Sequence, residues 1–328
     1  MIGYYVHHHG RGHLARASSI CARLPRPVTV LSSLAIPDQP NFSSVLLPRD
    51  DTGDSFPDPT ANGTLHWVPL RNSGLRERMQ KIVDWVSEAK PELMVVDVSV
   101  EVALLVRLLG VPVLVMAMPG DRTDSPHELV YRVAEHIIAP WPEELYEPQW
   151  LHSHAAKTTY VGGISRFDGR AVSPATGSDG ANVLVLNGAG GSGFDMAAVN
   201  RCAAQYPQYR WSALGVAGAP WVEDPWSALC SADVVISSAG QSSVADIAAA
   251  GRPAIIIAED RPFAEQDAMG RALERGGLAV VQHGWPQLQD WPTLIDRART
   301  LADDRWQRWG TRGAAARAAA TILRVTSS

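Results

Sequence analysis

The feature of this chain that most constrains its fold is a regular alternation of short apolar runs with segments of helical periodicity, which is the signature of βαβ units. In the first half the apolar runs are β-branched and nearly continuous, as strands covered on both faces of a parallel sheet should be. The expected strands there are Ile2–Val6, Val28–Leu31, Leu93–Val96, Val113–Met116 and Ile137–Ile138. This half of the chain therefore predicts a parallel α/β sheet.

The second half restarts the same alternation. Its expected strands are Val183–Leu186, Tyr209–Ala213, Val234–Ile236, Ala254–Ile257 and Leu278–Val281. Between the halves, residues 162–182 are rich in Gly, Ser, Pro and Asp and lack periodicity, which is typical of a linker. A length of 328 residues also favours about two domains. We expect two doubly wound parallel-sheet domains, residues 1–163 and 164–305, with a helix within 306–328 that packs back on the first.

Composition excludes several classes of protein. With 46% hydrophobic and 19% charged residues, the chain is neither disordered nor dependent on metal or disulfide staples. A net charge of -5 argues against a protein that binds nucleic acid nonspecifically. Three distant cysteines fit reduced thiols in the cytoplasm. Arginine-rich, lysine-poor usage suggests a bacterial source.

The chain shows no segment typical of export or of membrane insertion. Charged and glycine residues interrupt any apolar region in the first dozen positions, so no signal peptide is expected. The most apolar stretch, residues 102–118, contains Arg107, Gly110 and Pro112 and is interpreted as a helix followed by a strand. We expect a cytoplasmic protein, with peripheral contact to the inner membrane face left open.

A glycine-rich turn, Gly10-Arg11-Gly12-His13, follows the first expected strand. With Ala15 it matches G-x-G-x-x-A, but no acid stands near the end of the second strand, so a dinucleotide site would lack its ribose contact. The turn places His13 near a helix amino terminus, which disfavours imidazolium and suits a general base. The alternatives are that His13 caps or packs at the turn, or that His7 and His9 share a metal ion.

Asp97 directly follows the buried strand Leu93–Val96. A carboxylate at the carboxyl end of a parallel strand lies at the crevice where such sheets bind ligands. It could accept the imidazole N–H of His13 and stabilise the imidazolium formed during base catalysis. The alternative is that Asp97 caps a helix that begins near Ser99.

A second glycine-rich turn, residues 187–193, links strand Val183–Leu186 to an expected helix. Its glycines allow close approach of an anion, and the helix start supplies N–H groups. Without the lysine of a P-loop, an NTPase is not expected. The turn is either a phosphate cradle or simply a flexible loop.

A third turn, residues 237–243, follows strand Val234–Ile236 and forms another helix start suited to an anion. Ser243 and Asp246 have the spacing of a capping box, so Asp246 is either a capping residue or an acceptor for ribose hydroxyls. Beyond the next strand, Glu265 and Gln266 begin another helix and could bind sugar hydroxyls, or simply favour the helix start.

These residues resemble a known family. Segments 231–240 and 246–253, with the helix that begins at Glu265-Gln266, are similar to the donor domain of family 28 glycosyltransferases. The first turn resembles that family's glycine-rich turn ending in Gly-His, and Gly188 to Gly191 resembles its second one. The likeness follows both halves in order and is most specific between residues 232 and 272.

The resemblance implies a GT-B fold, in which two Rossmann-like domains face a cleft, and an inverting, metal-independent transfer without a cofactor. The donor would be a nucleotide-diphosphate sugar, expected to be a UDP-sugar, and the acceptor a hydroxyl of a small molecule or a lipid-linked glycan. Position by position, it implies His13 as the catalytic base, Asp246 at the ribose, the backbone near Val222 at the nucleobase, and Glu265 and Gln266 at the donor sugar. Asp97, the second expected catalytic residue, resembles the aspartate partner of that base in related plant-type transferases. The implied diphosphate residues are Gly12, Gly188, Gly190, Gly191, Gly240, Gln241, Ser242 and Ser243.

The chain departs from the family where Asp246 replaces a glutamate, Ser237-Ser238 an arginine-containing turn, and residues 187–191 Gly-Gly-Ser-Gln-Gly. The nucleotide and sugar therefore stay open. A hydrolase or epimerase on the same donor site, and a non-catalytic nucleotide-sugar-binding protein, are the alternative functions. For Trp141, Tyr146 and Trp150 we favour internal packing over an acceptor platform or a membrane contact.

Overall fold

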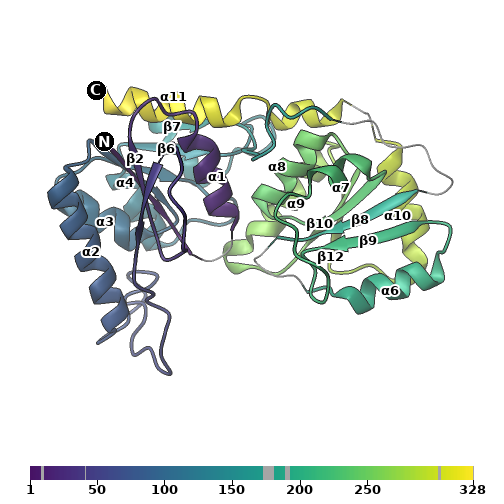
Figure 1. The fold of residues 1–328 in the computed structure, drawn as a ribbon, viewed down its shortest axis with the longest axis horizontal. Coiled ribbons are helices and arrows are strands. Elements are labelled where there is room, and N and C mark those ends of the chain that lie inside the picture. Colours follow the sequence, from purple (N-terminus) through teal and green to yellow (C-terminus); the bar gives the residue numbers. More distant parts are fainter. Residues whose placement is uncertain (9–10, 41, 173–180, 189–192, 302–303, 328) are drawn as a thin grey trace.

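The structure is a computed structural model that describes residues 1–8, 11–40, 42–172, 181–188, 193–301 and 304–327. Two parallel β-sheets form two halves that lie side by side (Figure 1). The first has the strand order β3-β2-β1-β4-β5-β6-β7 and the second the order β12-β11-β10-β8-β9. All neighbouring strands in both sheets are parallel.

The strands are bounded as follows. The first sheet contains β1 (Ile2–Val6), β2 (Val28–Ser32), β3 (Phe42–Leu46), β4 (Leu93–Asp97), β5 (Val113–Met116), β6 (His136–Ala139) and β7 (Thr158–Tyr160). The second contains β8 (Asn182–Leu186), β9 (Arg210–Leu214), β10 (Val234–Ser238), β11 (Ala254–Ala258) and β12 (Val280–His283). Every strand expected from the apolar runs is present, with its ends within two residues of the expected ones. The unexpected strands, β3 and β7, are the two edges of the first sheet.

Helices connect the strands and cover both faces of each sheet. The first half contains α1 (Gly12–Cys21), α2 (Ser73–Ala89), α3 (Val100–Leu108), α4 (Ser125–Val133), α5 (Gln149–His152) and the 3₁₀ helix η1 (Ala155–Lys157). The second contains α6 (Met196–Gln205), α7 (Trp226–Ser231), α8 (Gln241–Ala250), η2 (Pro262–Ala264), α9 (Glu265–Arg275), η3 (Leu288–Asp290), α10 (Trp291–Arg299) and η4 (Arg305–Trp309), and the chain ends in α11 (Ala314–Thr326).

Alternating side chains of a strand enter different layers of the core. Tyr4 of β1 packs in one cluster with Ile20 of α1 and Ala318 of α11, whereas Tyr5 packs in another with Ile82 of α2. The last helix, α11, therefore lies on the first sheet together with α1, although it follows the second sheet in the sequence (Figure 1).

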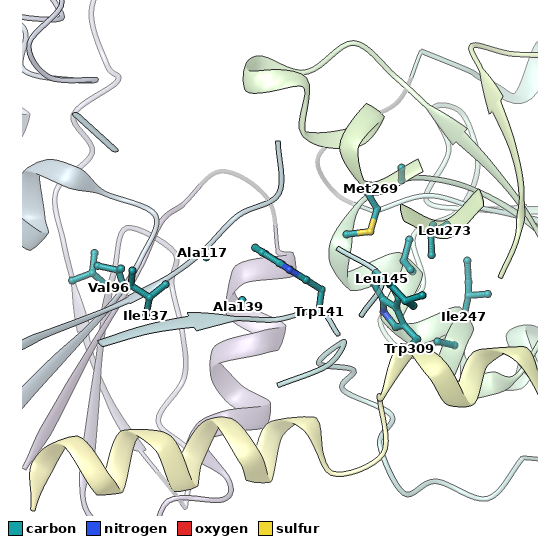
Figure 2. Packing of buried hydrophobic residues seen from close by; sticks show 14 of the residues in the cluster. Val96, Ala117, Ile137, Ala139, Trp141, Leu145, Ile247, Met269, Leu273 and Trp309 are labelled. Carbon is teal, nitrogen blue, oxygen red and sulfur yellow. The ribbon is translucent and has the colours of Figure 1, made fainter. Parts of the chain in front are cut away.

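One apolar cluster runs continuously from the first sheet to the second. Trp141 and Leu145, which follow β6, lie close to Met269 and Leu273 of α9 and to Trp309 of η4 (Figure 2). Trp141 is fully buried, so the two halves share part of one core.

The aromatic residues after β6 pack internally, as favoured above. The indole N–H of Trp141 donates to the Tyr146 carbonyl oxygen at 2.8 Å, and that of Trp150 donates to the Gly120 carbonyl oxygen at 2.9 Å. Trp141 thereby bonds within the segment after β6, whereas Trp150 ties that segment to the loop after β5.

Two further expectations can be compared with the structure. Cys21, Cys202 and Cys230 are all free and buried, which agrees with reduced thiols. Within the described ranges, no helix has both the length and the apolar character needed to cross a bilayer.

Candidate functional site

A cavity of about 470 Å³ lies between the two halves, at the carboxyl ends of strands from the second sheet. Its walls come from one side of α1 along its length, from the first two turns of α8, from the turn after β8 and from the segment after β9. Residues that contribute to these walls include Arg11, Gly12, Asn187, Gly188, Ser242 and Ser243. The cavity therefore occupies the position expected for a ligand in an open α/β sheet.

The amino termini of α1 and α8 meet at this cavity. The Ser242 hydroxyl donates to the Gly12 carbonyl oxygen at 3.2 Å, and a Cβ on Gly12 would lie only 2.7 Å from Ser242 Oγ. Position 12 therefore tolerates only glycine without displacement. Neither Arg11 nor Gly240, the N-cap residues, caps its helix with a side-chain hydrogen bond. The first-turn N–H groups and the positive ends of two helix dipoles thus face one region.

Two side-chain amides at the turns of the second half add unsatisfied donors. Asn187 Nδ2 and Gln241 Nε2 are buried and have no hydrogen-bond acceptor in the part of the chain that the structure describes. Asn187 Oδ1 is held by the Ser238 hydroxyl at 3.0 Å, which fixes the orientation of the amide. Buried donors without a partner are rare in folded proteins, and an anionic ligand would satisfy them.

Asp97 and His13 form a hydrogen-bonded pair beside the cavity. Parallel pairing of β1 with β4 places Asp97 opposite Val6, next to the turn that leads into α1. His13 Nδ1 lies 2.9 Å from Asp97 Oδ1, and Asp97 is completely buried. Ser99, not Asp97, caps α3 by accepting from the Val102 N–H, so the capping alternative for Asp97 is wrong.

His13 is the second residue of α1, as expected, and makes no capping bond there. Its side chain is 18% exposed and is not among those that line the 470 Å³ cavity, whereas its neighbour Gly12 is. The imidazole is therefore adjacent to the cavity, held from behind by a buried carboxylate.

Arg16 completes this pair and was not anticipated from the sequence. Its Nε donates to Asp97 Oδ2 at 3.0 Å and its Nη2 to Oδ1 at 2.5 Å, while Nη1 donates to Gln241 Oε1 at 2.9 Å. Burial by itself would raise the pKa of the Asp97 carboxyl, but the charges of Arg16 and His13 outweigh it and hold that pKa well below its usual range. Asp97 is thus a permanent carboxylate.

Asp246 borders the cavity but points largely into the protein. It is 6% exposed, and its two oxygens accept from Ser165 Oγ at 2.7 Å and from Arg166 Nε at 3.1 Å. Burial raises the pKa of this carboxyl despite the nearby Arg166 charge. Each oxygen can still accept a further hydrogen bond. Because α8 begins at Gln241 with Gly240 as its N-cap, Ser243 is an interior residue and the capping-box alternative is wrong.

Of the other residues expected to bind the sugar donor, some line the cavity and others do not. Gly188 and Val222 line the cavity, whereas Gly190 and Gly191 lie outside the described residues. Gln266 Oε1 accepts from the Ala239 N–H at 3.2 Å and the Glu259 N–H at 3.1 Å, so this oxygen ties the ends of β10 and β11 together.

Glu265 interacts with the first half of the chain. Its carboxylate lies 3.4 Å from Arg122 Nη2, and the preceding Phe263 accepts from the Asp121 N–H through its carbonyl oxygen at 2.7 Å. The Arg122 guanidinium also lies 4.5 Å from the centre of the Phe263 ring. Neither Glu265 nor Gln266 lines the 470 Å³ cavity: Glu265 lies at a second contact between the halves, and Gln266 bonds within the second half.

Two side-chain groups among the described residues could offer three ligands to a metal ion: His66 with Asp124 and His127, and His8 with Asp50 and Asp51. In the first, the Asp124 oxygens already lie 3.0 Å from His66 Nε2 and 2.5 Å from His127 Nδ1. These pairs are satisfied as hydrogen bonds without an ion. The expected alternative of His7 with His9 cannot be placed, because His9 lies outside the described residues.

Comparison with known proteins agrees with this architecture. Residues 200–282 match the family model described as the glycosyltransferase family 28 C-terminal domain. A relative from Sorangium cellulosum (strain So ce56) is 27% identical over 315 residues, covering 80% of this chain and 74% of its own length. It is named UDP-N-acetylglucosamine–N-acetylmuramyl-(pentapeptide) pyrophosphoryl-undecaprenol N-acetylglucosamine transferase.

Solved structures are similar over nearly the whole chain. The glycotransferase of kitacinnamycin has a TM-score of 0.68 at 14% identity, covering 99% of this chain and 98% of its own. MurG from Acinetobacter baumannii has a TM-score of 0.63 at 16% identity, covering 98% of this chain and 99% of its own. These similarities extend across both sheets and the helices between them.

Proposed function

We propose a specific reaction for this chain, which is a GT-B glycosyltransferase resembling family 28: it transfers a sugar from a UDP-sugar to a hydroxyl acceptor, with inversion and without a metal ion. The observation that carries the proposal is the position of the His13–Asp97 pair beside a cavity that two uncapped helix amino termini border. A base and an anion site are thus adjacent, as a displacement at a sugar phosphate requires.

The reaction needs one proton transfer and one displacement. His13 Nε2 takes the proton of the acceptor hydroxyl while the hydroxyl oxygen bonds to C1 of the sugar. The bond between C1 and the diphosphate oxygen breaks, and the nucleoside diphosphate leaves with the electron pair. Asp97 stabilises the imidazolium, which later releases its proton to solvent. Attack opposite the leaving group inverts C1.

Charge on the leaving diphosphate would be stabilised by main-chain and amide donors. We assign it to Gly12, Gly188 and the first turn of α8, from Gly240 through Gln241 and Ser242 to Ser243, with Asn187 Nδ2 as a further donor. The same assignment holds for Gly190 and Gly191, beyond the described residues. These donors can perform the neutralisation that a divalent ion supplies in other enzymes.

The rest of the donor fits around this anion site. We assign the base to the backbone near Val222, the ribose to Asp246, and the donor sugar to Glu265 and Gln266. The last assignment requires the sugar to extend from the 470 Å³ cavity toward the contact between Arg122 and Glu265. The UDP group is supported by the name of the Sorangium relative, an N-acetylglucosamine transferase that uses UDP-N-acetylglucosamine.

The division of labour between the halves follows. Residues 1–163 with the helix within 306–328 would bind the acceptor, and residues 164–305 the donor. We propose a cytoplasmic enzyme whose acceptor is a small molecule or a lipid-linked glycan. The lipid-linked option draws on the relative's name, which specifies a pyrophosphoryl-undecaprenol acceptor.

The deciding experiment is a product assay. The purified chain is incubated with UDP-, TDP- and GDP-sugars and with hydroxyl acceptors that include an undecaprenyl-pyrophosphoryl glycan, and products are identified by mass spectrometry. We expect a glycosylated acceptor of inverted anomeric configuration by NMR, at a rate unchanged by EDTA. Stoichiometric release of free or epimerised sugar without acceptor would instead identify a hydrolase or epimerase. Donor binding without turnover of any acceptor would identify a binding protein.

A further inference from the structure

We propose that Arg16 is a positioning residue that holds the His13–Asp97 pair in the protonation state a general base requires and connects it to the donor-binding helix α8 through Gln241. This inference rests on the function proposed above, since it concerns the base in that reaction.

Arg16 is buried next to the His13–Asp97 pair and bonds directly to it. It follows His13 by three positions on α1, so both side chains lie on one face of the helix. Arg16 is 4% exposed and holds both oxygens of the fully buried Asp97 through Nε and Nη2. A two-point bond of this kind fixes the carboxylate plane as well as its distance.

The arrangement selects one tautomer of His13. Its Nδ1 lies 2.9 Å from Asp97 Oδ1 and 3.0 Å from Arg16 Nη2. If Nδ1 carried a lone pair, it would accept from Arg16 but face the negative oxygen at close range. If Nδ1 carries the proton, it donates to Oδ1, and Arg16 donates to the same oxygen. The carboxylate favours the second state, which leaves the lone pair on Nε2 for the acceptor hydroxyl.

Arg16 also brings a fixed positive charge next to that base. Its guanidinium lies 3.0 Å from the ring and neutralises part of the Asp97 charge, so the imidazole and Arg16 share one carboxylate. Among the described residues, the further titratable groups around this network include Tyr4 of β1, Cys21 of α1 and Glu265 of α9. Burial raises the pKa of Tyr4 well above its ordinary value, so this hydroxyl is neutral beside Asp97.

The contact with Gln241 connects the base to the donor. Gln241 Oε1 accepts from Arg16 Nη1, while its buried Nε2 has no acceptor among the residues described. Its neighbours Ser242 and Ser243 line the cavity assigned to the diphosphate. A donor oxygen that accepts from Nε2 would hold the amide, and hence Arg16, in the orientation seen here.

The primary test is the pH profile of kcat/KM for R16Q, R16K and R23Q. For R16Q we expect the acidic limb to move to higher pH by about one unit or more, because a cation beside the ring is gone. R16K retains the charge but not the two-point bond, so its limb should stay near that of the parent while kcat falls about tenfold. R23Q, which changes the exposed Arg23 just after α1, is the matched control and should behave as the parent.

A second readout separates this inference from the reaction itself. NMR titration of labelled histidines, with H13A used to assign the His13 ring, reports protonation without any turnover. A higher midpoint for this ring in R16Q than in the parent and R23Q supports the inference even if no acceptor is ever found. Unchanged midpoints and an unmoved acidic limb in R16Q would overturn it. Should R16Q not fold, an R16K enzyme with unaltered kcat would overturn it equally.

Discussion

The two sides of the cleft carry different kinds of chemical groups, and each kind suits a different step of the proposed reaction. On the first side, ionisable side chains bond to one another: His13, Asp97 and Arg16 form one hydrogen-bonded network, which reaches the second side through Gln241. On the second, main-chain N–H groups, small hydroxyls and amides from the turns after β8 and β10 surround the cavity. Proton transfer needs a group whose charge can change, whereas binding a diphosphate needs donors whose charge cannot.

This difference also predicts how strongly a single substitution on each side reduces activity. A titratable network depends on a few atoms, so one substitution should abolish its function. An anion site made of many amides loses only one contribution at a time. The following predictions are ordered by the size of the effect this contrast implies.

The largest effect should follow H13A. Removing the base should lower kcat by about 10²- to 10⁴-fold while leaving affinity for nucleoside diphosphate unchanged, because the donors assigned to the diphosphate are main-chain N–H groups, hydroxyls and amides and do not include the imidazole. Steady-state kinetics and calorimetric titration of UDP measure the two quantities. A matched loss of UDP affinity would show that the two sides are not separable.

The next effect should follow G12A, which tests the contact between the two sides. The added methyl group would lie 2.7 Å from Ser242 Oγ, and such overpacking costs about 1–3 kcal/mol, so kcat/KM should fall at least about fivefold. S242A removes the clashing oxygen but also a residue assigned to the diphosphate, so G12A/S242A should show little further loss relative to S242A alone. A G12A step as costly in the S242A background as in the parent would mean that the close approach of α1 and α8 is unimportant.

A smaller effect is expected for D246N, which changes one acceptor in the donor site. UDP affinity should fall about tenfold in calorimetry, since a hydrogen bond to a charged group contributes about 1.5–3 kcal/mol. Ser165→Ala, which alters a donor to the same carboxylate, should have a weaker effect in the same direction.

Asp246 also predicts a pH dependence. Because burial raises the pKa of this carboxyl, it takes up a proton at higher pH than an exposed aspartate would. UDP affinity should therefore decrease as the solution is acidified through that range, and D246N should not show this decrease. The same decrease in D246N would assign it to another group.

The smallest effect should follow W221A. Trp221 borders the cavity but is 49% exposed, so removing it costs only part of an apolar wall. We expect UDP affinity to fall a few-fold, by roughly 1 kcal/mol, in the same calorimetric assay. An unchanged UDP affinity would show that the nucleobase of UDP does not pack against Trp221.

The strands were predictable because buried parallel strands carry a continuous apolar pattern. Ile2–Val6 and Val113–Met116 have the expected ends, since every residue in them is buried. The edge strands escaped prediction for the opposite reason. Phe42–Leu46 contains two serines and is only partly buried, and Thr158–Tyr160 is short and polar, so neither resembles a covered strand.

The candidate site was predictable where topology alone brings residues together. His13 and Asp97 follow neighbouring parallel strands, and their hydrogen bond follows from that register. Arg16 had a weaker signal, its spacing of three from His13 on a helix. Ser165 and Arg166 had none, because they lie in an aperiodic segment and reach Asp246 only through the tertiary fold.

The apolar cluster around Trp141, Leu273 and Trp309 has a consequence for how the molecule responds to heat and to ligands. Because this one cluster includes residues of both sheets, the two halves should unfold as one cooperative body and not as independent domains. Calorimetric melting should then show a single transition, and a nucleotide bound to the second sheet should raise the melting temperature of the first sheet as well.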